Sequence, residues 1–391
     1  MNLVECERLD DLGRGIAYID GKIVFISNLL PTEEAYVEII QEKKKYSIGK
    51  VIKLVKKSKY RCNDKNTDYS DLSHLKYENQ LEYKEKKLTN IFKKFGIKIK
   101  INPIIKGKNI WNYRNKVTLK VEEKCGYYKN SSHDFLPINF HPLANKNINK
   151  IIDIISKENL SNVKEIIIKS YDESMVIIKG TMNISKLKKQ VQSIYVNEKC
   201  IYGNNYVQAH IDNLKFLVGP ESFFQVNSEV TTKLYNEVLK NINKEDENIL
   251  DLYCGAGTIS LFLAKKAKRV LGIEINKEAI KCANLNKKLN NIENVDFICG
   301  DVSKEIHKIK SKTDVIVVDP PRAGLTKEGI DDILKINPPK IIYVSCDPIT
   351  LARDIALLKN YEANSSTPFD MFPQTHHVEC VSVLHRKSLK K

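Results

Sequence analysis

The spacing of apolar and polar residues changes along this chain of 391 residues and divides it into three parts. Short strand-like runs separated by turn residues fill residues 1–58. A mixture of helical and strand-like patterns covers residues 59–215. From 216 to 391, apolar strand-like runs alternate with helical segments. We therefore predict three domains with boundaries near residues 58 and 215.

The first part predicts a small β-barrel. Asp20-Gly21 is a strong hairpin signal after the strand-like run 16–19. Further strand-like runs follow at 24–26, 35–40 and 50–55. Five short strands within about 55 residues are typical of a barrel of the oligonucleotide-binding kind.

The middle part, 59–215, predicts an α+β domain. Residues 59–75 are polar and indicate a linker, and 76–95 have a helical period. The apolar face of that helix is predicted to contain Leu81, Leu88, Ile91, Phe92 and Phe95. Strand-like runs at 164–170 and 175–180 flank Asp172-Glu173 and predict a β-hairpin.

The last part predicts an α/β fold, a mostly parallel sheet with helices on both faces. Its candidate strands are 248–252, 269–274, 295–299, 314–318 and 340–345, followed by 379–385. In such sheets ligands bind beyond the carboxyl ends of the strands. Candidate chemistry is therefore sought at those ends.

The balance of charge favours a polyanionic partner, most simply nucleic acid. Lys and Arg number 64 against 48 Asp and Glu, a formal net charge of +16. The alternative is a lysine-rich background without consequence for binding, but residues 43–61 hold nine basic residues and no acid. No window approaches a membrane span, and the N-terminal residues do not resemble a signal peptide. We expect a cytoplasmic monomer with no membrane partner.

A glycine turn and two acids predict a nucleotide-like ligand. The strand-like run 248–253 ends in Cys254-Gly255-Ala256-Gly257-Thr258, where glycines let a ligand approach the backbone. Glu274 ends the next predicted strand, near the spacing at which an acid binds a ribose hydroxyl, and Asp301 follows the third. The alternative is a purely structural turn. The missing Gly-x-Gly-x-x-Gly pattern argues against a dinucleotide.

Two further strand ends carry candidate catalytic groups. Asp319 begins the rigid turn Asp319-Pro320-Pro321-Arg322, where its alternative role is to cap the turn. Cys346 follows the run 341–344, where its alternative role is that of a small apolar core residue. None of the other eight cysteines forms a Cys-x-x-Cys pair, so neither a disulfide framework nor a zinc site is expected.

A cysteine beside a methyl donor allows methylation of uracil C5, which is a poor nucleophile. Addition of a thiolate to C6 makes C5 an enolate carbon, and a base must then remove the C5 proton. Glu379 is the candidate base, and its alternative role is that of a strand-surface carboxylate. The adjacent His376 and His377 could be metal ligands, but neighbours on a strand point to opposite faces, and we predict no metal.

These residues resemble the RNA (uracil-5-)-methyltransferase family over nearly the whole chain. The motifs are Phe223-Phe224-Gln225-Val226-Asn227, Asp251-Leu252-Tyr253-Cys254-Gly255, Ile273-Glu274, Asp319-Pro320-Pro321-Arg322, Ser345-Cys346-Asp347-Pro348 and His377-Val378-Glu379-Cys380. The resemblance implies that Cys346 is the nucleophile and Glu379 the proton acceptor. It implies a Rossmann-like domain whose S-adenosylmethionine site is lined by Gln225, Tyr253, Gly255, Glu274, Asp301 and Asp319.

The resemblance also bears on the RNA. Residues 1–58 look like a TRAM domain, an RNA-binding barrel common in the branch that acts on 23S ribosomal RNA and absent from the transfer-RNA branch. Structured RNA, with 23S ribosomal RNA favoured and tRNA as the alternative, is therefore the expected partner. The segment Tyr113-Arg114-Asn115-Lys116 matches a family segment that we expect near the RNA.

One departure from the family concerns an iron–sulfur cluster. Many ribosomal-RNA members hold a [4Fe–4S] cluster with four cysteines, three of them closely spaced. Here Cys62 stands alone until Cys125, and the segment expected to hold a fourth reads Asn139-Phe140-His141-Pro142. We predict no cluster, with polar packing in its place.

Two other classes of function remain open at this point: methylation of a different chemical group, and RNA binding without catalysis. A methyltransferase acting on an exocyclic amine would prefer Asn-Pro-Pro-aromatic at the turn where this chain has Asp319-Pro320-Pro321-Arg322. A cytosine-C5 enzyme would carry Pro-Cys there. A non-catalytic RNA-binding or folding protein would need only the barrel and the charge, and would keep its role without the Cys346 thiol.

Overall fold

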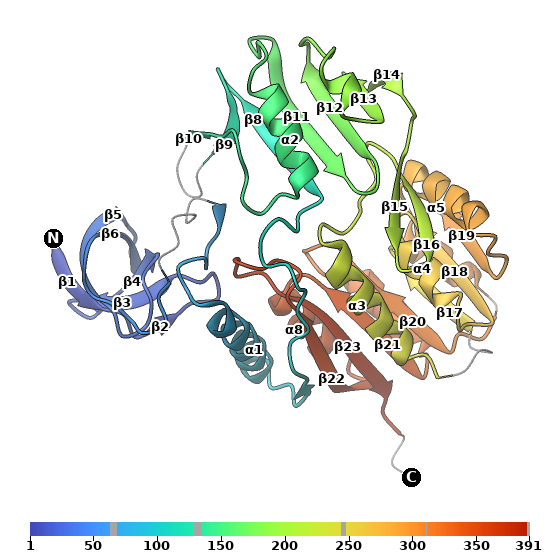
Figure 1. The fold of residues 1–391 in the computed structure, drawn as a ribbon. Helices are drawn as coiled ribbons and strands as arrows, with labels where there is room; N and C mark the ends of the chain where they lie inside the picture. The colour runs from blue at the N-terminus through green and yellow to red at the C-terminus, as the bar shows by residue number, and fades with distance from the viewer. Residues whose placement is uncertain (63–68, 129–133, 244–247, 310, 389–391) are drawn as a thin grey trace. The chain divides into compact units, whose positions relative to one another are not determined.

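The computed structural model describes residues 1–62, 69–128, 134–243, 248–309 and 311–388 (Figure 1). The chain forms two compact units, one of Met1–Asn90 with Phe372–Val378 and one of Ile91–Met371 with Glu379–Lys391. It therefore passes between the units three times. The predicted boundaries near 58 and 215 stay predictions, and residues 63–68 of the predicted linker lie outside the described residues.

The first unit begins with a six-stranded sheet in the order β1-β5-β6-β4-β3-β2. Its strands are β1 (Asn2–Glu5), β2 (Arg8–Leu9), β3 (Gly15–Ile19), β4 (Lys22–Ser27), β5 (Glu34–Glu42) and β6 (Tyr46–Lys56). The predicted hairpin is confirmed, because Asp20 and Gly21 both have positive φ between β3 and β4. Register shifts in the β5–β6 pair are β-bulges, which bend and twist a sheet. Its inner face buries Val4, Ala17, Val24, Ile26 and Val37.

Helix α1 (Tyr77–Lys94) confirms the predicted helix and crosses the division between the units at residues 90 and 91. Leu81, Leu88, Ile91 and Phe92 are buried, as their spacing predicts. Phe95 does not join them: it follows the last helical residue and is 38% exposed. The helix ends before Gly96, whose φ of +69° lies in the left-handed region that favours glycine at a helix end.

The second unit contains a seven-stranded mixed sheet in the order β10-β9-β8-β11-β12-β13-β14. The strands are β8 (Lys116–Val121), β9 (Cys125–Tyr128), β10 (Phe135–Pro137), β11 (Val163–Ser170), β12 (Ser174–Gly180), β13 (Ser193–Val196) and β14 (Lys199–Gly203). The antiparallel β11–β12 pair confirms the predicted hairpin. Helix α2 (Lys146–Ile155) packs against β11 through a face of buried isoleucines.

The eight-stranded sheet of the second unit has the order β19-β18-β17-β20-β21-β23-β22-β7. Its strands are β7 (Lys100–Ile101), β17 (Asn248–Leu252), β18 (Arg269–Glu274), β19 (Val295–Cys299), β20 (Val315–Val318), β21 (Lys340–Ser345), β22 (Tyr361–Phe369) and β23 (Glu379–Arg386). The five strands from β19 to β21 are parallel, which confirms the predicted α/β fold.

Helices connect successive strands of that sheet, as Figure 1 shows in yellow to red. They are α4 (Thr258–Leu263), α5 (Lys277–Leu289), α6 (Val302–Glu305) with the 3₁₀ turn η3 (Ile306–Lys308), α7 (Lys327–Ile336) and α8 (Pro348–Leu357). Before the sheet come the turn η2 (Leu187–Lys189), the hairpin β15 (Val207–Ile211) with β16 (Leu214–Val218), and α3 (Ser228–Lys240). None of the described helices is long and apolar enough to cross a bilayer.

Strand β22 is not foreseen by the apolar pattern. Its residues are Tyr-Glu-Ala-Asn-Ser-Ser-Thr-Pro-Phe, with no alternation, and proline is unusual inside a sheet. The register shifts between Ala363 and Ser365, so Asn364 has no cross-strand partner. The strand pairs with β23 along its length and with the two-residue β7 on its other side. These pairings, and not the local propensity of its residues, stabilise the extended conformation.

A buried ion pair stabilises the first unit. The Glu33 side chain is fully buried and accepts hydrogen bonds from Arg61 Nε at 2.6 Å and Arg61 Nη2 at 2.7 Å. The amides of Leu30 and Ser58 donate to the same carboxylate at 2.8 and 3.1 Å. Burial alone raises the pKa of Glu33, but Arg61 and the two amides hold it below its ordinary value. The carboxylate thus joins the segment after β6 to the loop before β5.

Replacement of Arg61 by methionine should lower the free energy of unfolding by about 3 kcal/mol, because it leaves the Glu33 charge buried without its cation. Lys56→Met is the control, since Lys56 forms an exposed pair with Glu34 and its loss should cost less than about 1 kcal/mol. Urea titration measures both. Adding Glu33→Gln to Arg61→Met should restore part of the loss, and equal losses for the two single variants would contradict the assignment.

Candidate active site

The predicted site residues meet at one edge of the eight-stranded sheet. Parallel strands β19, β18, β17, β20 and β21 all end at this edge, and the antiparallel β23 begins there. In order along the edge, the residues at or just beyond these ends are Asp301, Glu274, Tyr253, Asp319, Cys346 and Glu379. Ligands of open α/β sheets bind at this position.

Cys346 and Glu379 are neighbours across the β21–β23 pair. The last pair in the antiparallel register is Ser345 with Cys380, so Cys346 is the next residue on one strand and Glu379 on the other. Glu379 also pairs with Phe369 of β22. Cys380 points to the opposite face and is fully buried, as expected from its sequence position. The thiol and the carboxyl group therefore face the same side of the sheet.

Burial keeps the carboxyl groups of Glu379 and Asp319 protonated at unusually high pH. It raises the pKa of Glu379 to about 8, to which the nearby Asp319 adds and which Arg322 opposes. Burial likewise raises the pKa of Asp319 to about 7. One oxygen of Glu379, Oε2, has no hydrogen-bond partner among the described residues. A buried polar atom without a partner is costly, and it is typical of an atom that a ligand engages.

The Cys346 thiol is also held in its protonated form in this environment. Burial raises its pKa to about 11, and the charges of Glu379 and Asp319 add to the shift. Arg322 opposes it through its charge and a side-chain hydrogen bond to the thiol. Sequence reasoning placed Arg322 in the turn after Asp319 without giving it a role. The turn itself was the signal, because Pro320 and Pro321 fix where both flanking side chains point.

The glycine turn after β17 has the backbone that a closely approaching ligand requires. Tyr253, Gly255 and Gly257 have φ of +65°, +54° and +76°, and nothing lies within 4 Å of a Cβ added at Gly255. Glu274 holds the turn, since its Oε2 accepts from Gly255 N at 3.2 Å and its Oε1 from Asn276 N at 2.8 Å. The open space beside Gly255 fits a nucleoside or amino-acid portion of a ligand.

Asp251 and Asp301 differ in their surroundings. Burial raises the pKa of Asp251 to about 7; Ser260 donates to one of its oxygens, and the other has no partner among the described residues. Asp301 is exposed and caps α6, accepting from Ser303 N at 2.9 Å. The buried carboxyl oxygens of Asp251 and Glu379 that have no partner among the described residues fit a cationic ligand better than an anionic one.

Gln225 precedes α3, and its backbone is fixed by a residue that the sequence assigned to RNA contact. Asn115 Nδ2 donates to Gln225 O at 2.9 Å and to Ser228 Oγ at 3.2 Å, and Asn115 N donates to Val226 O. Phe223, two residues before Gln225, is 67% exposed. Asn115 is only 3% exposed, so its place in the structure is that of a support for Gln225.

Lys169, which sequence reasoning missed, supports the turn just before Phe223. It is buried on β11, and its Nζ donates to the carbonyls of Gly219, Pro220 and Ser222 at 2.8, 2.7 and 3.0 Å. Three acceptors satisfy the three donors of an ammonium group. Burial lowers the pKa of Lys169 to about 7. A lone lysine at the end of an apolar strand is the only signal in the sequence.

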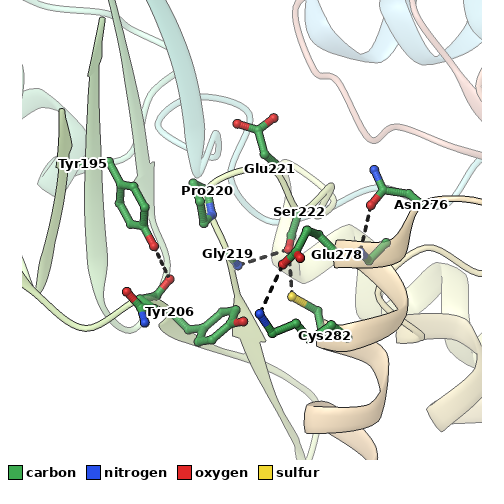
Figure 2. Close-up of a pocket in the computed structure, with 12 residues that line it drawn as sticks. Tyr195, Tyr206, Gly219, Pro220, Glu221, Ser222, Asn276, Glu278 and Cys282 are labelled. Carbon is green, nitrogen blue, oxygen red and sulfur yellow. Dashed lines mark hydrogen bonds and ion pairs between the residues drawn. The ribbon is translucent and has the colours of Figure 1, made fainter. Parts of the chain in front are cut away.

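The same turn forms one wall of a cavity of about 160 Å³ beside α5 (Figure 2). Its lining also includes Tyr195, Tyr206, Asn276, Glu278 and Cys282. Figure 2 shows Ser222, at the end of this turn, beside Cys282 of α5. Its Oγ accepts from Gly219 N at 3.1 Å and lies 3.3 Å from Cys282 Sγ. None of the predicted site residues lines this cavity, but its lining residue Asn276 donates to Glu274 at the end of β18.

His376 and His377 are not strand neighbours, as the sequence reading assumed, because they lie in the turn before β23. Their rings are 4.0 Å apart, and His376 Nδ1 lies 2.7 Å from Asp71 Oδ2. Among the described residues, no group of three or more His, Cys, Asp or Glu side chains could hold a metal ion.

The cysteines nearest to the family's cluster positions make local hydrogen bonds. Cys62 Sγ lies 2.9 Å from Ser73 O, and the buried Cys125 Sγ lies 3.4 Å from Ile138 O. His141 is buried as well; its Nδ1 accepts from Leu143 N at 3.1 Å, and Asn149 Oδ1 accepts from its amide. Burial lowers the pKa of His141 to about 4, so this histidine is neutral at pH 7.

Comparison with known families gives two matches within the chain. Residues 171–387 match the tRNA (Uracil-5-)-methyltransferase family, and residues 3–52 match the TRAM domain. The chain is 34% identical to an uncharacterised RNA methyltransferase of Clostridium acetobutylicum, over 96% of this chain and 95% of the relative. It is 35% identical to one of Oceanobacillus iheyensis, over 97% of this chain and 95% of that protein.

A solved structure is also similar over almost the full length. It is the Pyrococcus abyssi tRNA (uracil-54, C5)-methyltransferase in complex with S-adenosyl-L-homocysteine, with a TM-score of 0.79 and 27% identity. The similarity covers 98% of this chain and 100% of that one.

The raised pKa of Glu379 predicts a stability gain when its charge is removed. An unfolded glutamate has a pKa near 4.3, so the folded protein binds the extra proton between roughly pH 4 and 8 and loses stability as pH rises through that range. Glu379→Gln should therefore melt about 2–4 °C higher than wild type, or more, at pH 8.5, with a smaller difference at pH 5.

Scanning calorimetry across pH 5–8.5 measures this difference. Because Asp319 titrates in both proteins, subtraction leaves the contribution of Glu379 together with its interaction with Asp319. Glu362→Gln, an exposed carboxylate on β22, is the control and should leave the melting temperature unchanged at every pH. A difference for Glu379→Gln that does not grow with pH would contradict the burial argument.

Proposed function

The chain belongs to the RNA (uracil-5-)-methyltransferase family, and on that premise we propose that it methylates a uridine of 23S ribosomal RNA with Cys346 as nucleophile and Glu379 as proton acceptor. The family's reaction is the S-adenosylmethionine-dependent methylation of uridine C5 in RNA. The observation that carries the catalytic assignment is the β21–β23 register, which makes Cys346 and Glu379 neighbours at the ligand-binding edge of the sheet.

The methyl donor would be held by the glycine turn and the strand ends around it. Bound S-adenosylmethionine supplies an electrophilic methyl group on a sulfonium. Tyr253 and Gly255 would line its path, Glu274 and Asp301 would face the nucleoside, and Gln225 and Asp319 would lie toward the reacting end. The buried acids Asp251, Asp319 and Glu379 favour the approach of a cation, and a positive charge nearby lowers their pKa values.

The first half of the reaction uses Cys346. Its thiolate adds to uracil C6, and the electron pair of the C5–C6 bond moves toward the C4 oxygen. The resulting enolate carbon, C5, takes the methyl group. Since burial raises the pKa of the thiol to about 11, the hydrogen bond from Arg322 is the contact that favours the anion before addition. Asp319 would contact the uracil ring or the methyl donor beside it.

The second half uses Glu379. Its carboxylate removes the proton from C5, the C5–C6 double bond forms again, and the C6–sulfur bond breaks to release Cys346 as a thiolate. The proton then leaves Glu379 for solvent. A pKa raised to about 8 gives a carboxyl group that holds this proton more strongly than an ordinary glutamate does. The buried, unpartnered Oε2 is the atom we assign to the C5 proton.

The choice of 23S ribosomal RNA is supported by the TRAM domain at residues 3–52, which is common in the ribosomal-RNA branch of the family. The expectation that tRNA enzymes lack this domain does not hold for the Pyrococcus abyssi enzyme, whose similarity covers 98% of this chain. Lys50, Lys53 and Lys56 on β6, with Lys57 and Lys59 after it, add positive charge to this barrel. Transfer RNA is the second candidate. It is favoured by the solved Pyrococcus abyssi enzyme, which is similar over 98% of this chain and acts on tRNA uridine 54.

Deletion of this protein's gene should remove 5-methyluridine from 23S ribosomal RNA and leave tRNA unchanged. Nucleoside mass spectrometry of the two purified RNA pools measures the loss, and mapping of ribosomal fragments then locates the uridine. Complementation with wild type should restore the modification, whereas Cys346→Ala should not. Loss of 5-methyluridine from tRNA alone would assign the enzyme to the second candidate.

RNA that carries 5-fluorouridine at the target should trap the protein. Fluorine cannot leave C5 as a proton, so the adduct with Cys346 cannot eliminate and should survive denaturing electrophoresis. Cys346→Ala should form none. Cys200→Ala is the matched control, because Cys200 is partly exposed like Cys346 but lies on β14 of the other sheet. Equal adduct in both variants would rule out Cys346 as the nucleophile.

A further inference from the structure

Residues Phe372–Val378, here called the strap, connect β22 to β23 of the catalytic sheet but pack with the first unit. Helix α1 holds the strap through Gln80, Lys84 and Lys87, which lie on one face of the helix because they are four and three residues apart. All three side chains form hydrogen bonds to strap residues. Every contact in this set lies within the first unit.

Gln80 forms a reciprocal pair with Gln374. The amide of Gln374 donates to Gln80 Oε1 at 3.0 Å, and Gln80 Nε2 donates to Gln374 Oε1 at 2.8 Å. Gln80 Nε2 also reaches the carbonyls of Leu72 and Leu75, and Leu72 N donates to Gln374 O. Gln374 has a φ of +68°, a strained value for a residue other than glycine. These bonds hold the strap in a conformation that it would not adopt alone.

Two buried lysines fix the strap on either side of Gln374. Lys84 is 0% exposed and donates to Phe372 O at 3.0 Å, and Lys87 is 8% exposed and donates to His376 O at 3.0 Å. His376 is held in turn by Asp71 at 2.7 Å. Burial of an ammonium group is costly unless its donors are satisfied. Two buried lysines of α1 that bind carbonyls of one seven-residue segment indicate that the position of this segment has a role in addition to core packing.

The strap continues into Glu379 without an intervening linker. Val378 is fully buried, and Glu379 is the first residue of β23. The Oε2 atom of Glu379 has no hydrogen-bond partner among the described residues, although Asp319 and Arg322 act on the carboxyl group through their charges. The pairing of β23 with β21 and β22 sets the register of Glu379, and the strap is the segment that leads the backbone into β23.

We propose that Gln80, Lys84 and Lys87 are positioning residues for the elimination step, because the strap they hold places the Glu379 carboxylate at the C5 proton. The proposal rests on the uridine-C5 reaction and on Glu379 as its proton acceptor. Methyl transfer needs Cys346 and the methyl donor, whereas proton removal needs Glu379. A loosened strap should therefore slow the second half of the reaction and leave the first half close to its normal rate.

The variant that tests this is Lys84→Met, which keeps the apolar stem and removes the bond to Phe372 O. With ordinary RNA and methyl-labelled S-adenosylmethionine, the enzyme should accumulate an adduct in which C5 is methylated and C6 is still bonded to Cys346. We expect roughly tenfold slower release of methylated RNA, with labelled adduct visible on denaturing gels, since small misplacements of a reacting group cost rate on this scale. The rate of adduct formation should change little.

Three further variants interpret the result. Lys86→Met changes an exposed lysine of the same helix and should behave as wild type. Lys84→Arg retains a donor and should recover part of the release rate. Lys87→Met removes the other lysine contact at a less buried position and provides the same test if Lys84→Met does not fold.

A purely structural role for the strap predicts a different pattern. A folded Lys84→Met or Lys87→Met enzyme that slows adduct formation and release equally, or changes neither, would overturn the proposal. The assay uses whichever RNA wild type methylates. Methylation of tRNA in place of ribosomal RNA would thus overturn the substrate proposal and leave the test of the strap intact.

Discussion

The hydrogen-bond register between β21 and β23 is the constraint on which the active site depends. The four strands parallel to β21 end at the same edge of the sheet because they run in the same direction. Glu379 comes from β23, which runs in the opposite direction. A shift of one residue would turn Glu379 to the opposite face and bring the buried Cys380 toward Cys346. Pairing on both sides of β23, with β21 and with β22, keeps this register.

Burial of ionisable groups follows from that arrangement and works against stability. Asp251, Asp319 and Glu379 are all held where the charged form is disfavoured, and Arg322 is the cation that moderates the charges around Cys346. Lys169, by contrast, is buried with all three of its donors bonded to carbonyl groups. The contrast separates the groups that maintain the fold from those that the ligand must complete.

The sequence predicts the catalytic sheet well because its central strands are buried on both faces and read as continuous apolar runs, such as 315–318 and 340–345. It does not predict β22, which depends on its neighbours. The motif residues were recognised through a family resemblance that gave their roles. The contacts of Lys169, and the bond between Gln80 and Gln374 across 294 positions, have no local signature, because each is formed only when distant segments fold together.

The strap also affects the order in which the chain can fold. Domains generally fold as the chain leaves the ribosome, N-terminal part first. The first unit of this protein contains Phe372–Val378, so its packing cannot be completed until residue 378 has been synthesised. Until then, the polar face of α1 lacks the carbonyls that Lys84 and Lys87 bind. A nascent barrel can form early, but the unit that contains it is finished only after Val378 has been synthesised.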